Sequence, residues 1–216
     1  MCIHGAKNAA LPILAAAILV DGNLKVGNVP DLLDIRVMLE ILESLGAEAV
    51  LNGDTVELNT SAMNSYHIPE HLMRQMRSSV FLMGPLLARF GRVQFYQPGG
   101  CAIGDRKIDL HLRGLESLGA KIEESGNMIM CSADQLRGAE IALDFPSVGA
   151  TENIMMAAVL AEGQTMISNA AREPEIEDLQ NFLNRLGADV KGAGTGTITI
   201  KGVSSLTPCP HYDVIP

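Results

Sequence analysis

The sequence contains no tryptophan, and its five phenylalanines and three tyrosines bring the aromatic share to only 4%. So few aromatic rings exclude an aromatic cage for a cationic ligand. The most apolar run, residues 9–20, is too short to span a bilayer and contains Pro12. Hydrophobic residues still make up 47% of the 216 residues, which is typical of a globular chain with a substantial core.

Basic residues are scarce as well, since 16 Lys and Arg stand against 25 Asp and Glu, for a formal net charge of −9. This balance argues against a general binder of nucleic acid or of an anionic membrane. It leaves an anionic small substrate open, because a few local cations can outweigh a distant negative surface. We therefore expect neither a nucleic acid nor a membrane as a partner.

Only four cysteines are present, and none has C-x-x-C or metal-ligand spacing. We expect free thiols in a reducing cytoplasm, with no bound metal and no other cofactor. Cys131 lies in an apolar strand pattern, so it is expected to be an inert core residue. The other three are Cys2, Cys101 and Cys209.

The chain contains an internal repeat with a period of roughly 70 residues, and such periods indicate a repeated structural unit. Leu-Gly-Ala occurs three times, at residues 45–47, 118–120 and 186–188. Before each glycine, apolar residues recur at i, i+7 and i+10, which places one apolar stripe on an amphipathic helix. The glycine suits the left-handed residue that ends a helix, and a hairpin is expected to follow.

Each copy also has an earlier helix that is apolar nearly all round and runs to Gly22, Gly91 or Gly163. Helices of this kind are expected at the centre of a domain. Each unit then reads strand, buried helix, strand, amphipathic helix and hairpin (βαβαββ), with the sheets outside. The sequence thus predicts an α/β fold of three pseudo-repeats in one domain.

The predicted domain covers residues 1–216, and no boundary is expected inside it. Its three repeats cover approximately residues 1–62, 63–135 and 136–204.

Three residue pairs precede the helix-ending glycines by 14 or 15 positions, at the expected N-termini of the buried helices. Free backbone N–H groups and the helix dipole make such ends receptive to anions. A Lys or Arg side chain at such an end is repelled by the positive end of the helix dipole. The presence of these cations is explained if a phosphate or carboxylate binds there. The alternative is a surface charge that turns into water. The pairs are Lys7-Asn8, Met76-Arg77 and Val148-Gly149.

The second copy contains a local insertion. The two glycines of a copy are 24 residues apart in the first and third copies and 28 in the second, and the four extra residues fall within residues 98–106. Extra loop length in one copy usually serves a site. Cys101 lies there between glycines, with Arg106 five residues later. We expect an exposed thiol that Arg106 biases toward thiolate, although a lone cysteine is more often a buried structural residue.

Two further features have structural interpretations. His111 is expected on the surface of a helix, with Asp109 in the first turn stabilising the helix N-terminus. The glycine-rich residues 192–196 lie between two strand patterns and no helix follows, so a hairpin turn is favoured over a phosphate loop.

Four motifs together resemble one known family. They are Gly-Ala-Lys-Asn (5–8), Met-Arg-Ser-Ser (76–79), Pro-Gly-Gly-Cys-Ala-Ile-Gly (98–104) and Phe-Pro-Ser-Val-Gly-Ala-Thr-Glu-Asn (145–153). In this order they resemble the UDP-N-acetylglucosamine 1-carboxyvinyltransferases (MurA) of the enolpyruvyl transferase family, over essentially the whole chain. The resemblance implies an inverse α/β barrel of three repeats. It also implies that this domain is one of two similar domains with the active site between them.

The resemblance further implies a reaction. The enolpyruvyl group of phosphoenolpyruvate is transferred to the 3-hydroxyl of UDP-N-acetylglucosamine with release of phosphate, at the first committed step of peptidoglycan synthesis. Such chemistry needs a phosphate and carboxylate clamp, a proton donor to the enol C3 and a base for the hydroxyl.

The family's functional residues can be carried over onto matching positions. By resemblance, Cys101 is the general acid and the target of fosfomycin, and Lys7, Asn8 and Arg106 contact phosphoenolpyruvate. Lys107 departs from the family, which commonly has proline there. The implied contacts to UDP-N-acetylglucosamine are Arg77, Arg106, Lys107, Ile108, Asp109, Leu110, Ser147, Val148 and Gly149.

Compared with that family, the chain is expected to be the first domain only, without the second domain that supplies the aspartate base. We expect it to have no appreciable transferase activity alone and at most weak ligand binding. One alternative is a 5-enolpyruvylshikimate-3-phosphate synthase, which Cys101 and the Ser-Val-Gly segment disfavour. The other is a non-catalytic scaffold, which the joint presence of Lys7, Arg77, Cys101 and Arg106 disfavours.

Overall fold

The structure, a computed structural model, describes residues 5–97 and 108–216. Four residues discussed above, Cys2, Cys101, Arg106 and Lys107, lie outside the described residues. The expectations for these four stay predictions.

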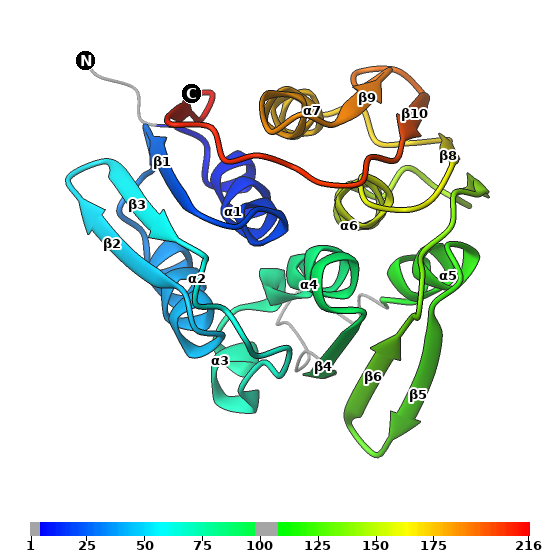
Figure 1. The fold of residues 1–216 in the computed structure, drawn as a ribbon, viewed down its shortest axis with the longest axis horizontal. Helices are drawn as coiled ribbons and strands as arrows, with labels where there is room; N and C mark the ends of the chain where they lie inside the picture. The colour runs from blue at the N-terminus through cyan, green and yellow to red at the C-terminus, as the bar shows by residue number, and fades with distance from the viewer. Residues whose placement is uncertain (1–4, 98–107) are drawn as a thin grey trace.

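Three apolar helices form the centre of the molecule (Figure 1): α1 (Lys7–Ala16), α4 (Met83–Phe90) and α6 (Val148–Ala158). Every residue of α1 and α6 beyond the first two is buried. The chain continues from α1 into a 3-10 helix, η1 (Ala17–Leu19). Among the described residues, no helix is long and apolar enough to cross a membrane.

Amphipathic helices lie around this centre, where the sequence predicts them. They are α2 (Leu33–Ser44), α5 (Asp109–Ser117) and α7 (Pro174–Arg185). The glycine after each helix is left-handed, with φ of 100° at Gly46, 96° at Gly119 and 100° at Gly187. The next alanine N–H donates to the leucine carbonyl five residues earlier, at 3.0 to 3.1 Å, which caps the helix end.

The expected hairpin follows each amphipathic helix and lies on the outside of the molecule (Figure 1). The hairpins are β2 (Glu48–Asn52) with β3 (Thr55–Asn59), β5 (Lys121–Ser125) with β6 (Met128–Ser132), and β9 (Asp189–Lys191) with β10 (Thr197–Lys201). Residues 192–196 join β9 to β10, with Gly192 and Gly194 at φ of 96° and 80°. The hairpin-turn prediction for this stretch is confirmed.

A strand after each central helix extends its hairpin into a sheet. These strands are β1 (Asn23–Gly27), β4 (Arg92–Tyr96) and β8 (Gln164–Ser168). The third sheet has the order β7-β8-β10-β9, with β7 (Glu140–Ala142) parallel to β8. The first has the order β11-β1-β3-β2, so β11 (Tyr212–Asp213), near the C-terminus, takes the place that β7 has in the third. In the middle sheet, β4-β6-β5, the corresponding position beside β4 has only an isolated parallel bridge, between His67 and Gln94 of β4. The α/β class with buried helices and outer sheets is confirmed.

The second copy departs from the prediction of one helix that begins at Met76-Arg77 and ends at Gly91. The chain there forms α3 (Glu70–Gln75), then a 3-10 helix, η2 (Arg77–Leu82), and only then α4. Asn153 of α6 supplies the reason. Its side-chain Nδ2 donates to the Val80 carbonyl at 2.9 Å, and its Oδ1 accepts the Gly84 N–H at 2.7 Å. In a continuous α-helix the Gly84 N–H would donate to the Val80 carbonyl. The inserted Asn153 side chain bonds to both groups instead, which interrupts the helical hydrogen bonds.

Candidate functional site

A cleft of about 830 Å³ opens at the N-terminal end of α6. Its lining comes from α1, η2, α5, α6 and α7 and from the segment just before α6. Six residues that the sequence predicts at the substrate site line this one cleft: Asn8, Arg77, Asp109, Ser147, Val148 and Gly149.

The first turn of α6 has the features of an anion-receptive helix end. Ser147 is its N-cap residue, with a side-chain oxygen that accepts the Ala150 N–H at 3.4 Å. The turn contains no acidic residue, so no side chain of that turn offsets the positive end of the dipole. A Cβ at Gly149 would lie 3.0 Å from His111 Cε1 and 3.2 Å from Phe81 Cε1, so glycine allows α5 and η2 to pack closely there.

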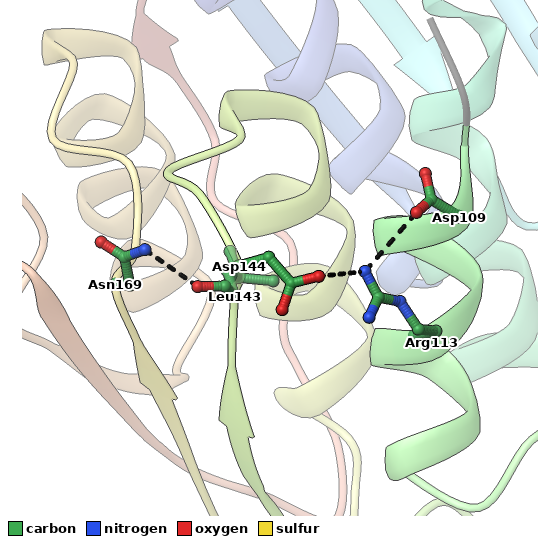
Figure 2. Close-up of polar contacts among 5 residues, drawn as sticks. All are labelled: Asp109, Arg113, Leu143, Asp144 and Asn169. Atoms are coloured by element: carbon green, nitrogen blue, oxygen red, sulfur yellow. Dashed lines mark hydrogen bonds and ion pairs between the residues drawn. The ribbon is translucent and has the colours of Figure 1, made fainter.

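The segment that leads into α6 is held from both sides (Figure 2). Arg113 of α5 binds Asp144 at 2.6 Å and Asp109 at 3.5 Å through the same nitrogen, Nη2. On the other side, Asn169 Nδ2 donates to the Leu143 carbonyl at 2.9 Å. Asn169 has a φ of 56°, a left-handed conformation that asparagine tolerates better than most residues. These contacts fix the approach to Ser147, while Phe145 is 58% exposed at the cleft.

His111 is buried and lines the cleft, so the prediction of a helix-surface histidine is wrong. Burial, and next the positive charge of Arg77, lower the pKa of His111 to about 4, while Asp109 opposes this shift. The imidazole is therefore neutral at physiological pH. Gly114, one turn later, allows this burial, because a Cβ there would lie 2.4 Å from Ile154 Cδ1 of α6.

The hydrogen-bond network also assigns the tautomer of His111. Asn153 Oδ1 accepts from the Gly84 N–H, so the amide nitrogen, Nδ2, must be the atom that faces His111. That nitrogen lies 2.8 Å from His111 Nδ1 and can only donate. Nδ1 is thus the acceptor, and the neutral ring has its proton on Nε2.

Glu152 is a cleft residue that the sequence reasoning missed. Its exposed fraction is 0%, and within the described chain neither carboxylate oxygen has a hydrogen-bond partner. Burial, and next the negative charges of Glu175 and Glu173, raise the pKa of Glu152 well above its usual value. The available signal was a lone carboxylate in the motif before the otherwise apolar residues 154–161.

Three further predicted residues are among the described ones but do not line the cleft. Lys7 is outside its lining and forms an ion pair with Asp34 of α2, with Nζ and Oδ2 2.6 Å apart. Ile108 is the residue before α5, and Leu110 is buried in the core at 4% exposure.

Of the described cysteines, Cys131 has the environment of an inert residue. It is fully buried, and burial raises the pKa of its thiol to about 12. Its predicted place in the core is confirmed.

Comparisons with known proteins agree in sequence and fold. The family model described as EPSP synthase (3-phosphoshikimate 1-carboxyvinyltransferase) matches residues 1–216. UDP-N-acetylglucosamine 1-carboxyvinyltransferase 2 of Carboxydothermus hydrogenoformans is 58% identical over 99% of this chain and 51% of its own length. UDP-N-acetylglucosamine 1-carboxyvinyltransferase 1 of Symbiobacterium thermophilum is 57% identical over 99% and 50%. The chain thus spans about half the length of the curated relatives it matches.

Solved structures show the same fold at lower sequence identity. The enolpyruvyl transferase NikO of Streptomyces tendae superposes with a TM-score of 0.87 at 23% identity, over 99% of this chain and 51% of that one. EPSP synthase of Acinetobacter baumannii gives 0.79 at 18% identity, over 99% and 49%. At these identities the likeness extends to the fold alone.

Proposed function

Because the chain belongs to the EPSP synthase (3-phosphoshikimate 1-carboxyvinyltransferase) family, we propose that it is one domain of an enolpyruvyl transferase that acts on UDP-N-acetylglucosamine. The complete enzyme would transfer the enolpyruvyl group of phosphoenolpyruvate to the 3-hydroxyl of the sugar and release phosphate. This is a cytoplasmic reaction of peptidoglycan synthesis. The curated relatives that share more than half of the residues of this chain have names with this activity.

The observation that carries the proposal is the convergence of polar residues at the start of α6. The backbone of Ser147, Val148 and Gly149 offers a helix N-terminus to an anion, and Arg77 adds a cation to the same cleft. A nucleoside diphosphate provides such an anion. Asp109, which also lines the cleft, can hydrogen-bond to the uncharged parts of a sugar nucleotide, and Asn8 on the same lining can contact phosphoenolpyruvate.

The proposed chemical roles follow the needs of the reaction. Cys101 gives a proton to C3 of phosphoenolpyruvate, and Lys7 and Arg106 neutralise its phosphate and carboxylate. Lys7 would exchange its ion pair with Asp34 for the ligand, a change of modest cost because both side chains are partly exposed. The base for the sugar hydroxyl would come from the other half of the longer relatives, so this chain alone is expected to be inactive.

A binding measurement on this chain tests the proposal. Calorimetry should show weak binding of UDP-N-acetylglucosamine and no binding of shikimate 3-phosphate, the acceptor that the related alternative requires. Arg77→Ala should weaken the sugar-nucleotide affinity by about 10- to 100-fold, because a hydrogen bond to a charged group is worth about 1.5–3 kcal/mol.

The matched control is Arg137→Ala, which removes an arginine that lies outside this cleft. It should leave the affinity unchanged. Equal binding by the Arg77→Ala variant and the unmodified chain, or a preference for shikimate 3-phosphate, would contradict the proposal.

A further inference from the structure

Glu152 has an arrangement that folding alone does not explain. Its side chain is completely buried at the cleft, and neither of its carboxylate oxygens has a hydrogen-bond partner within the described residues. Buried polar groups in proteins almost always have such partners, and one without a partner lowers the stability of the fold. A carboxyl in this place therefore calls for a partner beyond the described residues, and a ligand in the cleft can supply one.

The position of Glu152 on α6 brings it close to the anion-receptive helix end. It follows Val148 by four residues and Gly149 by three, so all three lie on the same face of the helix. Side chains of a helix lean toward its N-terminus. This geometry directs the Glu152 carboxyl toward the first turn of α6, which lines the same cleft.

The charged and titratable groups around Glu152 decide its own charge. Glu175 of α7 lines the same cleft, and with Glu173 it places negative charge nearby. From η2 and α5 the cleft receives the cation Arg77, the carboxylate Asp109 and the neutral imidazole of His111, and from α1 it receives only the uncharged Asn8 and Leu11. Burial and the two glutamates raise the pKa of Glu152 well above its usual value. The side chain is then a carboxylic acid at a pH where an exposed glutamate is ionised.

Resting on the proposed function, we propose that Glu152 is a ligand-binding residue whose carboxyl hydrogen-bonds to an uncharged hydroxyl or amide group of the sugar nucleotide. A protonated carboxyl donates through its O–H and accepts through its C=O, which matches a hydroxyl or an amide. It also leaves the adjacent diphosphate site free of a repelling charge. An ionised Glu152 would oppose the same diphosphate.

Two variants of Glu152 test this role by calorimetry with UDP-N-acetylglucosamine. Glu152→Met keeps the volume and removes the hydrogen bonds, so the affinity should fall about 3- to 10-fold, the value of a neutral hydrogen bond. Glu152→Gln keeps a donor and an acceptor, so its affinity should stay within about twofold of the unmodified chain. The affinity of the unmodified chain should fall as the pH is raised and Glu152 ionises, whereas that of Glu152→Gln should not show this fall.

The matched control is Thr165→Val on β8. Thr165 Oγ1 is also buried without a partner in the described chain, but it lies outside the cleft. Thermal unfolding should show that Glu152→Met and Thr165→Val are both folded and at least as stable as the unmodified chain, and only Glu152→Met should bind the nucleotide less tightly. Equal affinity of Glu152→Met and the unmodified chain would overturn the inference alone. No binding by the unmodified chain would overturn the proposed function as well.

Discussion

Two buried titratable side chains, His111 and Glu152, set the electrostatics of the cleft at the scale of single residues. Burial keeps both of them neutral, because it lowers the pKa of the imidazole to about 4 and raises that of the carboxyl. Each neutral group can still donate and accept hydrogen bonds, so the cleft wall is polar but has little charge of its own at these two places. That combination suits a ligand with an anionic part and several uncharged hydroxyl and amide groups.

The neutral state of Glu152 predicts a pH-dependent stability difference between the unmodified chain and Glu152→Gln. Below the ordinary glutamate pKa of 4.5, both the folded and the unfolded chain have a protonated Glu152, and the two proteins should differ little. Above it, the unfolded chain releases the proton while the folded chain keeps it. The unmodified protein therefore loses stability as the pH rises toward the folded-state pKa, and the glutamine variant does not.

Urea unfolding at several pH values measures this difference. The gap in unfolding free energy should open above pH 4.5 and widen by about 1.4 kcal/mol per pH unit until the folded-state pKa of Glu152 is reached. Glu173 and Glu175 are present in both proteins, so their own titration cancels. A gap that is constant with pH would show that Glu152 is ionised in the folded chain.

The sequence could indicate residue types at this site but not their partners. The prediction for His111 failed because the alternation around it fits a surface position, and only the packing of α5 against α6 buries the ring. Asn8, Arg77 and Gly149 were found from their register before the helix-ending glycines. Glu152 lies in the same motif as Gly149, yet its lack of a partner is visible only in three dimensions.

The Asn153 side chain connects several structural elements around the cleft. Its side chain joins α6 to η2 and α4 through Val80 and Gly84, and to α5 through His111. Gly84 is required at this contact, since a Cβ there would lie 2.3 Å from the Asn153 carbonyl oxygen. One amide group thus sets the break between η2 and α4, the tautomer of His111 and the separation of three elements that line the cleft.

Asn153→Ala should therefore affect both stability and binding. Removing the amide leaves buried polar groups without partners, so the unfolding free energy should fall by about 2–4 kcal/mol in a urea titration. Ligand affinity should fall as well, because α5 and η2 lose their fixed positions beside α6. Asn184→Ala is the matched control, because the Asn184 amide also bridges two backbone groups, both of Val190, but outside the cleft. The account would be wrong if both variants lost stability and neither lost affinity.

At the scale of helices and strands, the sequence correctly predicted those elements that depend on residues close to one another in the chain. The amphipathic helices, their glycine ends and the hairpins after them follow from the spacing of apolar residues and from single glycines. The helix predicted before Gly91 was divided instead, because the residue that interrupts it, Asn153, is about 70 positions away in the sequence. No local pattern contains that information.

In the whole molecule, the arrangement of the three units around the buried helices creates the site (Figure 1). The cleft lining comes from elements of all three units: α1 gives Asn8, η2 gives Arg77, α5 gives His111, and α6 and α7 give Glu152 and Glu175. A repeated unit places equivalent helix ends on the same side of a domain, and this is why register within the repeat could find residues that are distant in sequence. The repeat boundaries and the role of a second domain stay predictions.

The central claim is that the N-terminal end of α6 is the nucleotide-binding site of this chain, and an NMR titration of the isotope-labelled protein with UDP-N-acetylglucosamine tests it most directly. The backbone amide signals of Val148 and Gly149 should shift with increasing ligand. Those of Ala161 and Gly163, beyond the opposite end of α6, should stay unchanged. Shifts confined to that opposite end, or no shifts at millimolar ligand, would contradict the account.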